Sequence, residues 1–206
     1  MKIVSGYDPG LTRVLLENTG ITTVSVTLKY GDTVTCVFEN TAPQTTRTQG
    51  FWATHPDLAH AAWFGGDAGG HHFDGVAAKL GDASLCGRAI TTDGQLMGAF
   101  WSSISKKSND DKRSALDQAR MQLLQQLIAA ELNASAFNAT PSVGSFTAWE
   151  SAFCGTNQNN IKTAASQAAS FNEAGDSGAF TPGMSADAKT AKSVANKAFW
   201  DKLPAG

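Results

Sequence analysis

The chain has 206 residues, 17% of them charged, and its 16 lysines and arginines nearly balance its 18 aspartates and glutamates, for a formal net charge of −2. This length accommodates one ordinary domain, or a small module and a medium one, with a real apolar core. The near-neutral charge offers no basic surface for nucleic acid, and no apolar run reaches the roughly eighteen residues of a membrane span. We therefore expect neither a nucleic-acid partner nor a membrane-spanning segment.

Residues 2–39 have the period-two alternation of β-strands, interrupted by Gly, Pro, Asn or Asp. Val24, Val26 and Leu28 alternate with Thr and Ser, which places the three apolar side chains on one face of a strand. Three or four strands bury little apolar area and leave open edges, so something must complete this module. The candidates are the helical part of the chain, the lost front half of a longer parent, and strands from another copy.

In the rest of the chain, apolar residues recur at the three- and four-residue spacing of amphipathic helices. Thr54 and Asp93 are the expected N-caps of the first two helices, and Thr147 opens a sequence with capping-box spacing. Asp110 would lie in the first turn of the longest helix, where the helix dipole favours acidic side chains. The pattern predicts helices over residues 56–64, 93–104, 108–133, 147–154, 161–171 and 191–199.

The predicted fold class is therefore α+β. A small antiparallel β module, an incomplete sandwich, covers residues 1–40, and a mainly α-helical domain covers residues 51–206. Between them, residues 41–50 contain the stretch TAPQTTRTQ, which has no periodicity and predicts a linker or an extended segment.

Three stretches carry a resemblance to a known family. The stretch VTLKYGDTVTCVFENT at residues 26–41 is similar to the closing hairpin of prealbumin-like (SpaA/Cna-B-type) β-sandwich repeats in bacterial surface proteins. TQGFWATHPD at 48–57 resembles the GYWKNHP-like signature that follows such repeats, and LLQQLIAAELN at 123–133 resembles part of the helical region beyond it. The resemblance implies a secreted or surface location and the end of a β-sandwich followed by helices, and it supplies no activity.

The signature falls on Gly50, Phe51, Trp52, His55 and Pro56. Between Trp52 and His55 this chain has Ala-Thr where the family has Lys-Asn. Anything that depends on that lysine therefore does not carry over to this chain.

All four histidines, His55, His60, His71 and His72, lie close together in the sequence among three aspartates. Imidazole and carboxylate groups are ligands for zinc, copper or nickel, so the four histidines are candidate metal ligands. His55 and His60 are five residues apart, which on a helix separates them by roughly 140°, and no HExxH motif is present. The alternative is that His55 caps or packs beside Trp52 and that His71 and His72 lie on a flexible glycine loop.

Five tryptophans lie in the predicted helical part, and four of them occupy positions that the helical pattern assigns to the inner face. This favours core packing, in which each indole N–H needs an acceptor. Exposed indole rings would instead stack on sugars, and this makes a carbohydrate-binding module the alternative function. The five are Trp52, Trp63, Trp101, Trp149 and Trp200.

Of the three cysteines, Cys86 and Cys154 are each followed by glycine, which suits a disulfide carried by turns, and we predict that these two are bridged. Cys36 would then be unpaired. No GxSxG motif supports nucleophilic catalysis. Glu131, Glu150 and Glu173 come from separate predicted elements, so the sequence does not identify a pair of catalytic carboxylates.

We therefore expect a non-enzymatic, secreted or cell-surface protein that acts in structure or adhesion. Extended segments at its open β edges could exchange between copies, which would make the protein a homo-oligomer and, if the contact does not close, a filament. The alternatives are a carbohydrate-binding module, with a cell-surface polysaccharide as partner, and a metal-dependent hydrolase that uses the histidines. No cofactor is expected.

Overall fold

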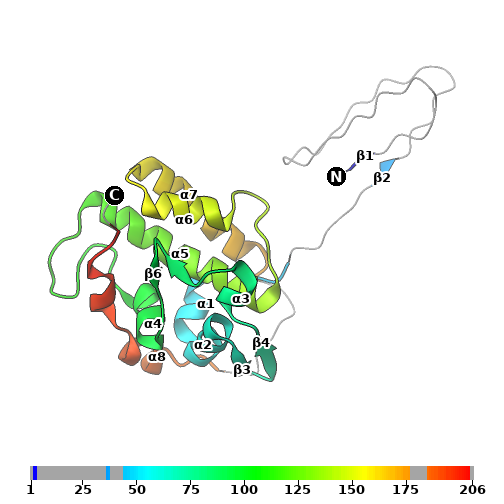
Figure 1. Cartoon of the computed structure of the whole chain (residues 1–206), viewed down its shortest axis with the longest axis horizontal. Helices are drawn as coiled ribbons and strands as arrows, with labels where there is room; N and C mark the ends of the chain where they lie inside the picture. Colours follow the sequence, from blue (N-terminus) through cyan, green and yellow to red (C-terminus); the bar gives the residue numbers. More distant parts are fainter. Residues whose placement is uncertain (1, 4–35, 38–43, 177–184, 205–206) are drawn as a thin grey trace, which may run out of the picture. The chain divides into compact units, whose positions relative to one another are not determined.

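The computed structural model describes residues 2–3, 36–37, 44–176 and 185–204, and the chain forms two compact units, Met1–Ala42 and Pro43–Gly206 (Figure 1). In the first unit, β1 (Lys2–Ile3) and β2 (Cys36–Val37) form an antiparallel pair. The other strands predicted for residues 1–40 lie outside the described residues. The predicted α+β class, with a small β part followed by a mainly helical domain, is confirmed.

The second unit is mainly helical, with two short antiparallel hairpins between its early helices. One hairpin pairs β3 (Gly66–Ala68) with β4 (His71–Phe73), and the other pairs β5 (Ser84–Leu85) with β6 (Arg88–Ala89). In the parts of the chain that are described, no helix is long and apolar enough to cross a membrane. The helices are α1 (Gln49–Thr54), α2 (Pro56–Phe64), α3 (Val76–Leu80), α4 (Asp93–Trp101), α5 (Ala115–Phe137), α6 (Phe146–Cys154), α7 (Gln158–Ala174), α8 (Ala188–Val194) and the 3-10 helix η1 (Lys197–Asp201).

Helix α5 lies at the centre of this unit, and α1, α2, α3, α4, α6 and α7 all pack against it. From Leu127 to Ala134 every residue is buried, so the second half of the helix is enclosed on all sides. Such a helix has no polar face to turn toward water. Its two polar residues in this stretch, Glu131 and Asn133, are therefore held in the interior.

The start of the longest helix was predicted incorrectly. It begins at Ala115 with Ser114 as its N-cap, whereas Asp110 belongs to the preceding loop. The cause is Arg113, whose buried guanidinium donates hydrogen bonds to the carbonyls of Ser103, Lys106 and Trp200. Those tertiary bonds hold the loop in a non-helical path and override its local helical pattern.

Two other predicted N-caps are also displaced. Thr54 is the last residue of α1, where its hydroxyl donates to the carbonyls of Gly50 and Phe51, and His55 is the N-cap of α2. Thr92, and not Asp93, caps α4 by accepting a hydrogen bond from the backbone N–H of Gln95.

The capping-box prediction at Thr147 is displaced by two residues, since Ser145 is the N-cap of α6 and its hydroxyl accepts from the N–H of Ala148. The helix ends at Cys154, as predicted.

The last predicted helix is divided into α8 and η1 at Ala195 and Asn196. Here the chain comes so close to α4 that a Cβ on Gly98 would lie 2.4 Å from the Asn196 carbonyl oxygen. The N–H of Asn196 donates to the carbonyl of Gly94, and its side chain caps η1. Contact with the backbone of α4 therefore interrupts the helical pattern.

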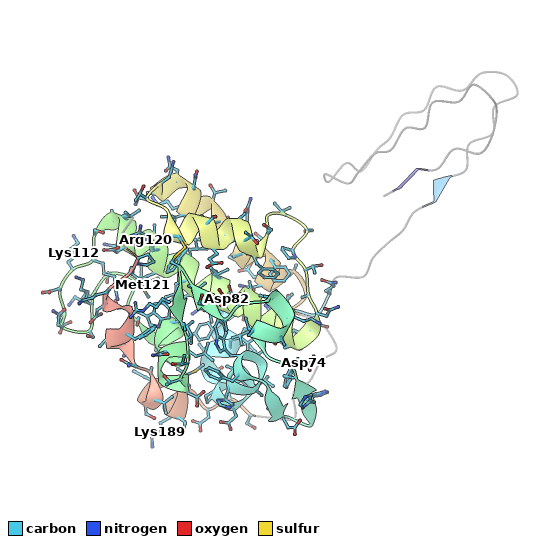
Figure 2. The ribbon with its side chains drawn as sticks, in the orientation of Figure 1. Asp74, Asp82, Lys112, Arg120, Met121 and Lys189 are labelled. Carbon is cyan, nitrogen blue, oxygen red and sulfur yellow. A yellow bond between two sulfur atoms is a disulfide. The ribbon has the colours of Figure 1, made fainter. Side chains whose placement is uncertain are left out.

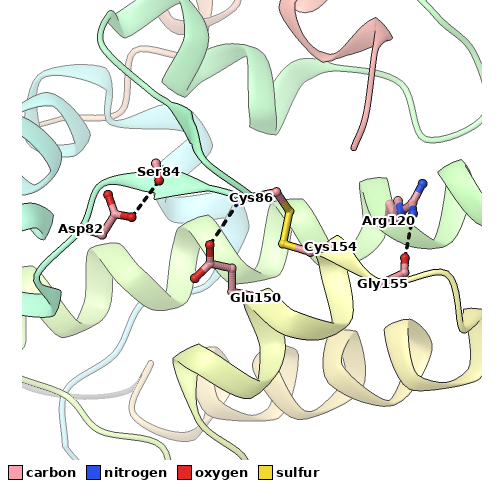
Figure 3. The surroundings of a disulfide bond; sticks show 7 residues. All are labelled: Asp82, Ser84, Cys86, Arg120, Glu150, Cys154 and Gly155. Atoms are coloured by element: carbon pink, nitrogen blue, oxygen red, sulfur yellow. Dashed lines mark hydrogen bonds between the residues drawn. A yellow bond between two sulfur atoms is a disulfide. The ribbon is translucent and has the colours of Figure 1, made fainter. Parts of the chain in front are cut away.

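The predicted Cys86–Cys154 disulfide is confirmed, with Cα atoms 5.6 Å apart (Figure 3). Cys86 and Gly87 have φ values of 54° and 71°, and they form the two-residue turn between β5 and β6. Cys154 is the last residue of α6. The bridge therefore ties the second hairpin to the end of a helix that is 68 residues away in the sequence.

The prediction that four tryptophans pack in the core is confirmed, because their side chains are buried and each indole N–H has an acceptor. Trp101 is half-buried and donates to the carbonyl of Ala53. The four buried rings are Trp52, Trp63, Trp149 and Trp200, which donate to Asn133, Ile90, Gln167 and Gln95 respectively.

Candidate functional site

The four histidines do not converge. His55 lies between α1 and α2, where its Nδ1 is 2.8 Å from the Phe51 carbonyl oxygen and its ring stacks on that of Phe51. His60 on α2 and His72 on β4 each pair with a different aspartate, with Nδ1–Oδ1 distances of 2.6 and 2.7 Å. His71 is exposed on β4, which forms a strand where a loop was predicted.

Within residues 44–176 and 185–204, no three His, Cys, Asp or Glu side chains are arranged to hold a metal ion. The geometry of the four histidines therefore gives no support to the metal-site hypothesis.

The signature residues build the joint between α1 and α2. Gly50 and Phe51 lie in α1, and Pro56 is the first residue of α2, a position that does not require a backbone N–H. Trp52 is fully buried, and its indole nitrogen lies 3.0 Å from Oδ1 of Asn133 on α5. Two of the motifs that carry the family resemblance, residues 48–57 and 123–133, thus meet in one hydrogen bond.

The side-chain amide of Asn133 is fully buried and makes four hydrogen bonds, and we call this arrangement the Asn133 hub. Its Oδ1 accepts from the backbone N–H of Arg47 at 2.8 Å and from Trp52. Its Nδ2 donates to the Arg47 carbonyl and to Oδ1 of Asn172 on α7, both at 2.9 Å. Because it pairs with both backbone groups of Arg47, the amide occupies the place that a neighbouring strand would take.

Residues 44–48, which we call the anchor segment, have no regular secondary structure and are bound to the end of α7 as well as to α5. The Thr46 hydroxyl donates to the Asn172 carbonyl at 2.9 Å and accepts from the Gly175 N–H at 2.8 Å. The Arg47 guanidinium donates to the carbonyls of Thr46 and Asp176. In the described part of the segment predicted at 41–50, residues 44–48 have no helix or strand, and α1 begins at Gln49.

Comparison of the chain with family models, with curated proteins and with solved structures finds no match. The family resemblance therefore stays a prediction that is based on the motifs.

Glu150 on α6 and Asp82, which follows α3, lie in the surroundings of the disulfide (Figure 3), and Asp82 is also labelled in Figure 2. The negative charges of both act on Glu131 of α5, and we call these three residues the carboxylate cluster. Oε1 of Glu150 accepts the backbone N–H of Cys86 at 3.1 Å, and Oδ2 of Asp82 accepts the Ser84 hydroxyl at 2.7 Å. Across the described chain, no lysine, arginine or histidine forms an ion pair with any of the three.

Glu131 is 7% exposed. Burial, followed by the negative charges of Glu150 and Asp82, raises its pKa well above the ordinary value for a glutamate. The sequence does not bring these residues together because they come from three separate elements. The available signal was Glu131 itself, the one charged residue in the apolar stretch LIAAELN.

The first prediction tests the anchor segment through Gly175, where a Cβ would lie 1.8 Å from the Gln44 carbonyl oxygen. Because the added methyl group displaces the segment and breaks the bonds of Thr46, Gly175→Ala should lower the free energy of unfolding by about 2–4 kcal/mol. Urea unfolding followed by tryptophan fluorescence measures this change. The matched control is Gly50→Ala in α1, where nothing lies within 4 Å of the new Cβ and the substitution should be neutral or stabilising. Equal losses in the two variants would contradict the assignment.

The second prediction concerns Glu131. Because its pKa is raised in the folded state, the folded protein binds more protons than the unfolded chain above about pH 4.5. The contribution of Glu131 to stability should therefore be largest below its unfolded pKa and should be lost as the pH rises through the raised folded pKa, by about 1.4 kcal/mol for each pH unit that separates the two pKa values.

Glu131→Gln, which cannot titrate, should remove this loss, as measured by urea unfolding between pH 5 and pH 9. Glu173→Gln on α7, an exposed position, should keep the wild-type pH dependence. If Glu131→Gln loses as much stability as the wild type over this range, the buried acid is not the cause.

Proposed function

We propose that this chain is a non-enzymatic protein of the cell surface or extracellular space, and that its helical domain provides a firm attachment for the unit that precedes it. The observation that carries the proposal is the binding of the anchor segment into the core of the domain. A structural or adhesion protein must pass tension along its chain. In such a protein, the point where the chain enters a domain has to resist being pulled away.

Three neighbouring residues of the anchor segment supply that resistance. Thr46 is bound to α7 through its hydroxyl and its backbone, Arg47 to α5 through both of its backbone groups, and the Thr48 N–H to the Asp176 carboxylate. A pull from the N-terminal side must break several of these bonds together before it reaches α1. Those of Thr46 and Arg47 are buried, so breaking them without water to replace them costs more than at the surface.

The disulfide supports the proposed location and also the mechanical role. Disulfides persist in oxidising environments, which include the extracellular space and the cell surface. Under tension the bridge also prevents the 68-residue loop between Cys86 and Cys154 from extending. With the disulfide intact, the domain would release a shorter length of chain on forced unfolding than it would with the disulfide reduced.

The other predicted functions remain predictions. For β1 to exchange between copies, it would have to leave β2 of its own chain and pair with β2 of a neighbouring copy, as in a domain swap. Carbohydrate binding would depend chiefly on Trp101, because the other four indoles are buried. A metal-dependent hydrolase would require the histidines to move together.

The experiment is single-molecule force spectroscopy on the full chain, pulled from its two ends. Gly175→Ala should lower the unfolding force of the helical domain, since it releases the anchor segment, and Gly50→Ala should leave the force unchanged. Reduction of the disulfide should add about 240 Å of released chain, from 68 residues at about 3.5 Å each. The proposal fails if Gly175→Ala unfolds at the wild-type force, because the anchor segment would then carry no load.

A further inference from the structure

Residues 197–204, which contain η1 and which we call the C-terminal strap, are held against the domain by Arg88. The guanidinium of Arg88 lies over the ring of Phe199, 3.6 Å from its centroid, and it donates hydrogen bonds to the carbonyls of Phe199 and Lys202. A cation over an aromatic ring and hydrogen bonds from a charged donor are among the stronger side-chain contacts. Arg88 therefore fixes the strap at two points along its length.

A second set of contacts holds the strap without Arg88. Nη1 of Arg113 donates to the Trp200 carbonyl at 2.9 Å. The Trp200 ring is buried, and its indole N–H donates to the Gln95 carbonyl of α4 at 2.8 Å. Loss of the Arg88 contacts should therefore loosen the strap locally and leave the rest of the domain folded.

Arg88 is carried by a hairpin that is too short to be stable by itself. Strands β5 and β6 pair over only two residues each, and an isolated two-stranded hairpin is at best marginally stable in water. Leu85 and Ile90 are buried and attach the two strands to the core. Cys86, in the turn, has a φ of 54°, which lies in the left-handed region that most residues other than glycine avoid. The turn therefore needs support from outside the hairpin.

Helix α6 supplies that support through two contacts with the turn (Figure 3). The disulfide joins Cys86 to Cys154, the last residue of α6, and Oε1 of Glu150 on the same helix accepts the Cys86 N–H at 3.1 Å. Arg88 follows Cys86 by two residues, so these contacts set the position from which its side chain reaches the strap. The disulfide, the turn, Arg88 and the strap thus form one connected series of contacts.

We propose that the Cys86–Cys154 disulfide is a redox-sensitive latch for the C-terminal strap. While the bridge is closed, the turn holds Arg88 on the strap, and reduction of the bridge by a dithiol loosens the strap. Cys86 and Cys154 are both partly exposed, so a dithiol can reach the bridge.

The reduction is an ordinary thiol–disulfide exchange. One thiolate of the dithiol attacks Sγ of one cysteine, which breaks the S–S bond, and the other Sγ leaves as a thiolate and takes up a proton. The second thiol of the reagent then displaces the first cysteine and closes a disulfide within the reagent. The protein ends with two thiols, having gained two electrons and two protons that the dithiol has lost.

The latch goes beyond the proposed attachment role and does not depend on it. The anchor segment is bound to α5 and α7, whereas the strap is bound to Arg88, to Arg113 and to α4. Reduction should therefore act on the strap and leave the anchor segment in place. The two proposals can fail separately, because each concerns a different segment and a different set of contacts.

The experiment is hydrogen exchange of the full chain, followed by mass spectrometry, before and after reduction with dithiothreitol. Reduction should speed the exchange of the strap amides, those of Phe199 and Trp200 among them, by about tenfold or more, since the two hydrogen bonds and the cation–π contact of Arg88 are weakened together. The amides of Thr46 and Arg47 should exchange as they do in the oxidised protein. An unchanged strap, or equal acceleration of the strap and the anchor segment, would overturn the proposal.

Two variants test whether the effect passes through Arg88. In oxidised protein, Arg88→Ala should reproduce the fast exchange of the strap, and reduction of this variant should add little, because the two changes remove the same contacts. The matched control is Lys162→Ala at an exposed position of α7, which should exchange like the wild type and respond to reduction as the wild type does. If reduction speeds exchange of the strap as much in Arg88→Ala as in the wild type, Arg88 does not connect the disulfide to the strap and the latch is ruled out.

Discussion

The helical domain depends on the pairing of one buried amide, that of Asn133, with the backbone of Arg47. Through this pairing, the segment that enters the domain is fixed to α5, and the same amide holds Trp52 of α1 and Asn172 of α7. Each bond contributes only about 0.5–1.5 kcal/mol to stability, but a buried amide left without partners costs more than that. The arrangement therefore specifies a single relative position for the three helices and the segment, because any other would leave polar groups unpaired in the core.

Helix α5 contains a second buried polar residue, Glu131, and its side chain is not paired as that of Asn133 is. Glu131 lies two positions before Asn133 in a stretch that is enclosed on all sides, yet its carboxyl group accepts no hydrogen bond, and burial together with the charges of Glu150 and Asp82 raises its pKa. A fully paired polar network stabilises a core, whereas an unpaired acid destabilises it. We therefore assign a structural role to the Asn133 hub.

Much of the fold could be predicted from local patterns, since helical spacing identified α2, α6 and α7, and glycines marked the Cys86–Cys154 bridge. The errors occurred where tertiary contacts override local preference. Arg113 holds the loop before α5 out of a helix, and the close approach of Asn196 to α4 divides the last helix. Both candidate sites were missed because each joins elements distant in sequence. A pattern shows that residues 123–133 are apolar, but it does not show what meets the polar side chains among them.

Native-state hydrogen exchange at the amide of Arg47 tests the central claim most directly. This N–H donates to the Asn133 side chain at 2.8 Å and lies only a few residues beyond the boundary between the two units. If the anchor segment is an integral part of the helical core, the amide should exchange only through global unfolding, with the same opening free energy as the amides of α5. Exchange orders of magnitude faster than that of α5 would mean that the segment separates from the folded domain, and this would contradict the account.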